Sequence, residues 1–83
     1  MLEKTVTVGL KNGLDAGAIA ALVQNACRFE CKIYLESNSK KINAKSIMGM
    51  MNIGVQSGKE LKITTDGSDE QAAMESFETY IAG

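Results

Sequence analysis

Three short stretches of the chain, residues 5–8, 32–36 and 60–65, alternate between apolar and polar side chains, and this pattern limits the fold most. Alternation with a period of two is typical of a β-strand that has one buried face and one solvated face. Residues 40–43 are predicted as a fourth, shorter strand, because their two lysines suit the edge of a sheet. Such strands need a layer that covers their apolar face.

Two longer stretches carry apolar residues at helical spacing instead. The first runs from about residue 16 to 28, and Asp15 before it suits the N-cap, where a carboxylate accepts from free N–H groups. The second is expected to begin at Ser68, which has the spacing of a capping box with Gln71. The predicted apolar stripes are Ile19, Leu22, Val23, Ala26 and Cys27 in the first helix, and Ala73, Phe77, Tyr80 and Ile81 in the second.

A third and shorter helix is predicted between Ser46, a good N-cap residue, and Gly54, which suits the left-handed C′ position. The apolar residues between them are Ile47, Met48, Met50, Met51 and Ile53. Because so short a helix cannot bury every side, some of these side chains must face solvent or a partner, and exposed methionines make an adaptable docking surface. The alternative is a core helix in which methionine only fills space.

The composition excludes several classes of protein. A length of 83 residues predicts one domain, residues 1–83, and a net charge of −1 without a basic stripe argues against a nucleic-acid partner. No apolar run approaches the roughly 20 residues of a membrane span, and the N-terminus has no apolar signal region, so we expect a cytoplasmic protein. Cys27 and Cys31 are expected as small buried thiols, because without a histidine they cannot complete a zinc site. Neither a metal nor a cofactor is predicted.

The predicted elements follow one another in the order βαββαβα. Three helices on one face of a four-stranded antiparallel sheet would cover the apolar side of the strands and leave the other side in water. The expected fold class is therefore α+β, an open-faced β-sandwich.

The segment Lys45-Ser46-Ile47-Met48-Gly49, followed by Gly54, resembles the regulatory-serine segment of HPr, the small phosphocarrier of the bacterial sugar phosphotransferase system. The turn at residues 66–70 lies at the matching distance downstream, and the resemblance covers nearly the whole chain. It implies the HPr-like open-faced sandwich, with the strands in the spatial order first, fourth, second, third. It also implies a protein that is not an enzyme.

The phosphorylation loop of the resembled family is altered in this chain. HPr-like proteins carry a phosphorylatable histidine before the first helix, followed by an arginine and a proline. The matching positions here hold Asp15, Gly17 and Ala18, and the chain contains no histidine. A phosphohistidine needs an imidazole nucleophile and a nearby cation, so we do not expect phosphocarrier activity. The chain resembles the Crh type, which keeps the regulatory serine without this histidine, although Crh proteins usually have glutamine at this position.

Asp15 has three interpretations. It is a helix N-cap, worth roughly 1 kcal/mol over alanine. Alternatively, its carboxylate is a fixed and partial mimic of the phosphorylated state, with one charge against roughly −1.5 to −2 for a phosphate. The third interpretation is direct phosphorylation to an acyl phosphate, although no cluster of acidic ligands surrounds it in the sequence.

Ser46 is either only a cap or also an acceptor of phosphate from HPr kinase/phosphorylase, since a phosphate at a helix N-terminus meets the dipole and free N–H groups. The resemblance implies that Lys45, Ile47, Met48 and Met51 bind partners. These partners would be HPr kinase/phosphorylase, enzyme I without productive phosphotransfer and, after phosphorylation, a LacI-type catabolite control repressor. The resulting hypothesis is a Crh-like regulatory protein. The alternatives are a phosphoryl relay through Asp15 and an unmodified competitor of HPr.

Overall fold

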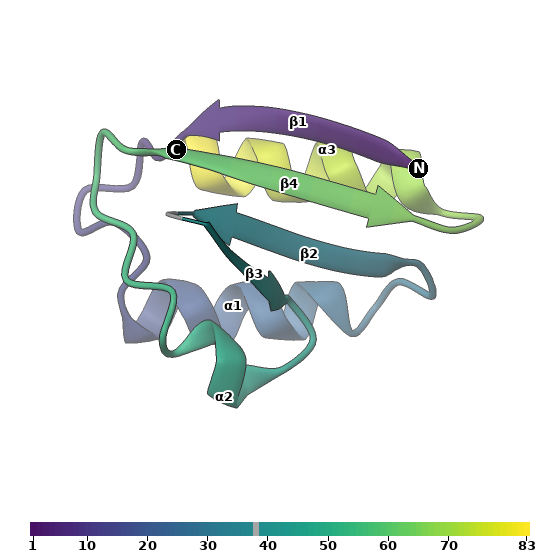
Figure 1. Cartoon of the computed structure of the whole chain (residues 1–83), viewed down its shortest axis with the longest axis horizontal. Coiled ribbons are helices and arrows are strands. Elements are labelled where there is room, and N and C mark those ends of the chain that lie inside the picture. The colour runs from purple at the N-terminus through teal and green to yellow at the C-terminus, as the bar shows by residue number, and fades with distance from the viewer. Residues whose placement is uncertain (38) are drawn as a thin grey trace.

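The computed structural model describes residues 1–37 and 39–83 (Figure 1). Its elements are β1 (Leu2–Thr7), α1 (Ala16–Ala26), β2 (Lys32–Ser37), β3 (Lys40–Asn43), α2 (Ile47–Met50), β4 (Glu60–Asp66) and α3 (Glu70–Ala82). The predicted order βαββαβα is therefore confirmed. Every helix in the described part of the chain is too short or too polar to cross a bilayer.

The four strands form one antiparallel sheet in the order β1-β4-β2-β3, which confirms the predicted arrangement. In Figure 1, α1 and α3 lie on the far side of the sheet, and α2 lies beside α1 at the end of β3. The near face of the sheet is left open. The lysine-rich strand β3 lies at one edge, as its composition predicts.

The core lies between the sheet and the helices. Ile33 and Leu35 alternate with more exposed residues along β2, and both are fully buried. Leu61 and Ile63 repeat this pattern on β4, where they meet Phe77, the largest fully buried side chain. The period of two in the strands and the helical period in α3 therefore place their apolar residues in one common layer.

Several predicted boundaries are wrong by a few residues. Strand β1 begins at Leu2 rather than Thr5, because Glu3 and Lys4 interrupt the apolar pattern while the backbone continues to pair with β4. Helix α1 ends at Ala26 and not near residue 28, because the next turn tightens: the Phe29 N–H donates to the Ala26 carbonyl over 3.1 Å. Between the strands predicted at residues 32–36 and 40–43, the sequence Ser37-Asn38-Ser39 predicts a hairpin turn, and Asn38 lies outside the described residues.

The predicted capping box at Ser68 is also wrong. Helix α3 begins at Glu70, so Asp69 occupies the N-cap position, and Asp69 makes no side-chain bond to its own helix. The carboxylate of Glu70 instead accepts from the Gly67 N–H at 3.1 Å. Ser68 and Asp69 are both good cap residues. The Asp69 carboxylate accepts from the N–H groups of Glu30 and Cys31, and these tertiary contacts hold Asp69 directly before the helix.

Two apolar assignments need correction. Cys31 is buried as expected, but Cys27 is exposed, because it follows the last residue of α1 as its C-cap. In α3, Tyr80 is 38% exposed and Met74 occupies the buried stripe in its place.

Candidate functional site

Ser46 caps the short helix α2, as its position in the sequence predicts. Its backbone is extended, and its side-chain oxygen accepts from the Gly49 N–H at 3.3 Å. The Ser46 N–H in turn donates to the Asn43 carbonyl at 3.0 Å. The residue is exposed, so its hydroxyl lies at the surface in front of the first turn of α2.

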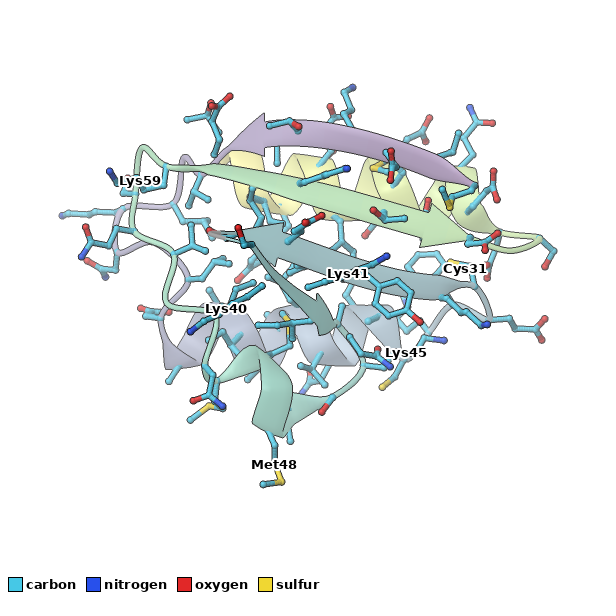
Figure 2. The ribbon with its side chains drawn as sticks, in the orientation of Figure 1. Cys31, Lys40, Lys41, Lys45, Met48 and Lys59 are labelled. Carbon is cyan, nitrogen blue, oxygen red and sulfur yellow. The ribbon has the colours of Figure 1, made fainter. Side chains whose placement is uncertain are left out.

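Three apolar side chains beside Ser46 face solvent, and we call them the α2 patch: Ile47, Met48 and Met51. Their exposed fractions are 48%, 80% and 58%, whereas Met50 in the same helix is fully buried. Figure 2 shows Met48 at the outer end of α2, pointing away from the body of the molecule. The predicted methionine cluster is therefore divided between the two sides of the helix: Met50 fills the core, whereas the α2 patch is exposed, and its role as a docking surface stays a prediction.

Gly54 has the left-handed conformation predicted for it, with a φ of 58°, but it is not the C′ residue of α2. The C-cap is Met51, and the turn continues through Ile53, whose N–H donates to the Met50 carbonyl at 3.1 Å. Gly54 therefore redirects the chain toward Val55 after the helix has already ended.

Gly49 contributes to the site in a way that sequence reasoning missed. A Cβ at this position would lie 3.1 Å from Ile42 Cγ2 and 3.5 Å from Ser46 Oγ. A glycine inside a helical pattern costs about 1 kcal/mol against alanine, and this cost is the signal that could have pointed to a packing role. Here Gly49 lets α2 pack closely against Ile42 of β3, whereas a Cβ would make only an ordinary contact with the serine oxygen.

Lys45, the residue before Ser46, is half-buried. Its ammonium nitrogen donates to the carbonyl oxygen of Phe29 at 2.7 Å, in the loop between α1 and β2. Its side chain is therefore bound within the molecule, although the sequence predicts it as a fourth member of the partner-binding surface.

Asp15 is the N-cap of α1, as predicted. Its Oδ1 accepts from the Ala18 N–H at 2.9 Å, and its backbone is extended. The residue is exposed, as is Gly17, which stands where the resembled family has arginine. The interpretations of Asp15 as a phosphate mimic or a phosphate acceptor stay predictions.

The loop before Asp15 contacts the segment that follows α2. The Leu14 N–H donates to the Val55 carbonyl at 2.9 Å. Gly13 has a φ of 65°, and a Cβ on it would lie 2.6 Å from the same carbonyl oxygen, so only glycine allows this approach. The structure thus connects the loop before Asp15 to the segment that follows α2 through the backbone of Val55.

Burial raises the pKa of the Cys31 thiol to about 11, and a hydrogen bond with the Asp69 carboxylate adds to this effect. The Glu30 N–H at 2.9 Å is the main cause that lowers the pKa of Asp69 itself. Within the described residues, no three histidine, cysteine or acidic side chains gather as a metal-ion site. A shallow groove between α1 and α3 includes Asn25 and Ser76, and neither Ser46 nor Asp15 lines it.

Comparison with known proteins gives consistent matches along the whole chain. A family model described as "PTS HPr component phosphorylation site" matches residues 2–83. The HPr-like protein Crh of Halalkalibacterium halodurans is 48% identical over 81 residues, which cover 98% of this chain and 96% of that protein. The HPr-like protein Crh of Bacillus subtilis is 44% identical, with 98% and 95% covered. The crystal structure of a phosphocarrier protein HPr from Bacillus anthracis matches with a TM-score of 0.93 at 45% identity, covering 96% of this chain and 95% of that one.

Proposed function

Since this chain belongs to the HPr family of the bacterial phosphotransferase system, which consists of non-catalytic proteins, we propose that it is a Crh-like regulator of carbon catabolite control. It acts in the cytoplasm by binding other proteins and by accepting a phosphate on Ser46. It does not carry phosphate on a histidine, because the sequence contains none. One observation carries this proposal: an exposed serine hydroxyl stands beside the exposed α2 patch.

The surroundings of Ser46 suit phosphorylation. Its oxygen accepts one hydrogen bond from the described residues, from Gly49 at 3.3 Å, and such a long bond is easily given up. A phosphate on this oxygen would bring a charge of about −1.5 to −2 to a surface whose neighbouring side chains are apolar. A partner that supplies cations would then bind the modified form better than the unmodified one.

The α2 patch is the proposed docking surface for HPr kinase/phosphorylase, for enzyme I without productive phosphotransfer and, after phosphorylation, for a LacI-type catabolite control repressor. Methionine side chains are flexible and polarisable, so one patch can adapt to several partners. Lys45 borders this patch, but its ammonium is bound to an internal carbonyl.

The carboxylate of Asp15 replaces the histidine of the phosphocarriers in the resembled motif. Its capping bond to Ala18 supports a structural role for this residue. A phosphoryl relay through Asp15 is the alternative, and its product would be an acyl phosphate that acid and base both hydrolyse.

The test is intact-mass spectrometry of the protein after two parallel incubations. One contains HPr kinase/phosphorylase with ATP, and the other contains enzyme I with phosphoenolpyruvate. We expect one phosphate from the kinase and none from enzyme I, with the addition lost in Ser46→Ala and kept in Asp15→Ala.

Two other results would support the alternatives. A phosphate added only by enzyme I, and lost in Asp15→Ala, would mean that the protein is a relay. If neither incubation adds mass, while the unmodified protein still competes with HPr for enzyme I, the protein would be an unmodified competitor.

A further inference from the structure

One peptide group in the loop between α1 and β2 is bound on both polar atoms by charged side chains. The carbonyl of Phe29 accepts from the Lys45 ammonium at 2.7 Å. The N–H of the same peptide, which belongs to Glu30, donates to the Asp69 carboxylate at 2.9 Å. A cation and an anion, from segments before α2 and before α3, therefore meet through a single peptide bond.

Both hydrogen bonds of this peptide group have one charged partner. Hydrogen bonds with one ionised partner are roughly twice as strong as neutral ones, and bonds in a chain polarise one another. The Lys45 ammonium withdraws electron density from the peptide, which makes the Glu30 N–H a better donor to Asp69. The same carboxylate also accepts from the Cys31 N–H at 2.9 Å, so Asp69 binds two consecutive amides of this loop.

The other end of this connection is the turn that presents Ser46. Three consecutive N–H groups of that turn are bound: Ala44 to the Ile33 carbonyl, Lys45 to the Asn43 side chain and Ser46 to the Asn43 carbonyl. Their lengths lie between 2.9 and 3.0 Å. Fixing the Lys45 side chain on the neighbouring loop therefore also fixes the backbone on which Ser46 stands.

We propose that Lys45 is a positioning residue for the phosphorylation of Ser46, and that it acts through the Phe29–Glu30 peptide and Asp69 rather than by touching the kinase. This inference rests on the proposed function and deepens it. The ammonium holds the turn before α2 in one orientation. The serine oxygen is therefore already placed for phosphate transfer when the kinase binds.

The position of Lys45 differs from that of the other lysines nearby. Lys40 and Lys41 of β3 are exposed, and the Lys41 ammonium lies 4.9 Å from the centre of the Tyr34 ring on the open face of the sheet (Figure 2). Lys40 therefore offers a matched control, because its loss removes a positive charge from the other end of β3 without breaking the connection to Phe29.

The experiment measures kcat and KM for phosphorylation of the full chain by HPr kinase/phosphorylase with ATP. The variants are Lys45→Met, which keeps the aliphatic stem, Asp69→Asn, which keeps the shape, and the two combined. We expect kcat to fall about three- to tenfold in each single variant, with KM within about twofold of the parent. The double variant should be no slower than the slower single variant, Lys45→Arg should recover most of the rate, and Lys40→Met should match the parent.

Amide hydrogen exchange of the unmodified variants provides a measurement without the kinase. We expect Asp69→Asn to speed exchange at the Ser46 N–H, although Asp69 and Ser46 form no hydrogen bond with each other. Exchange at Ala73, within α3, should change little in Lys45→Met.

Three results would overturn the role of Lys45. A rise in KM alone in Lys45→Met would indicate a direct contact with the kinase. An unchanged kcat in Asp69→Asn, or additive effects in the double variant, would show that Lys45 does not act through Asp69. If the parent protein accepts no phosphate, the proposed function fails and this inference falls with it. A phosphorylated parent with unaffected variants would remove only the role of Lys45.

Discussion

The carboxylate of Asp15 holds the first turn of α1, so its removal should affect stability more than phosphorylation. In Asp15→Ala the Ala18 N–H loses its acceptor, and we expect the free energy of unfolding to fall by about 1 kcal/mol. Urea denaturation measures this loss, and Asp15→Asn is the control, because its amide oxygen can still accept. Equal stability of the alanine variant and the parent would mean that the capping bond contributes nothing, and would contradict the interpretation of Asp15 as a helix N-cap.

Single residues could be predicted where their partners are local. Ser46 and Asp15 each bond an N–H three residues further on, so their cap roles are visible in the sequence. Lys45 and Asp69 bond partners that lie 16 and 39 residues away, and no local pattern contains that information. The same long-range contact explains why the capping box predicted at Ser68 is wrong.

Helix α2 carries methionine on both its buried and its exposed side. The contributions of this residue type to folding and to binding can therefore be tested separately within one element. Met50 is fully buried, so Met50→Ala should lower the free energy of unfolding by about 2 to 5 kcal/mol. Met48 is 80% exposed, so Met48→Ala should change it by less than about 0.5 kcal/mol. Denaturant titration of both variants checks this contrast.

Binding to HPr kinase/phosphorylase should be affected in the opposite way to stability, more by Met48→Ala than by Met50→Ala. We expect Met48→Ala to raise the KM for HPr kinase/phosphorylase, because the α2 patch loses its most exposed side chain. The concentration of folded Met50→Ala should be matched by circular dichroism, and its KM should then equal that of the parent. A kinase that binds Met48→Ala as well as the parent would contradict docking on the α2 patch.

The other strands and helices show which features of the fold the sequence pattern could predict. The alternation in β2 predicted which side chains are buried, because residues two apart lie on one face of a strand. In β4 the alternation holds only as far as Ile63, because Thr64 and Thr65 are both buried. The order of the strands in the sheet came only from the family resemblance, since each strand pairs with segments that are distant in the sequence. In α3, helical spacing fitted both Tyr80 and Met74, and packing against the sheet selected Met74.

For the whole molecule, we expect low pH to reduce the stability of the fold at the start of α3 and at its hydrogen bonds to the loop after α1. Backbone N–H groups lower the pKa of Asp69 and Glu70, chiefly those of Glu30 and Gly67 respectively. A carboxyl group with a lowered pKa in the folded state stabilises the fold above its unfolded pKa, 3.8 and 4.5 here, and this contribution is lost as the pH falls through the folded pKa.

The melting temperature should therefore fall as the pH drops below these two values. Asp69→Asn and Glu70→Gln should each make that fall shallower than in the parent. Parallel profiles for the parent and both variants would show that these two carboxylates do not contribute to acid unfolding.

The two cysteines report on the opening of the whole fold. Cys27 is exposed at the end of α1, whereas Cys31 is buried and its pKa is raised to about 11, so its thiol stays protonated near neutral pH. Because the thiolate is the reactive form, iodoacetamide at pH 8 should add one group quickly to the folded protein and a second only after unfolding. Mass spectrometry of Cys27→Ser should then show slow alkylation at the rate set by opening of the fold, and Cys31→Ser should show one fast addition.

Met50→Ala should speed the slow alkylation of Cys31, because it raises the population of the unfolded state, whereas Met48→Ala should not. Equally fast alkylation of both thiols in the parent would mean that the loop beneath Asp69 opens on its own, and that the bond between Lys45 and Phe29 does not hold it closed.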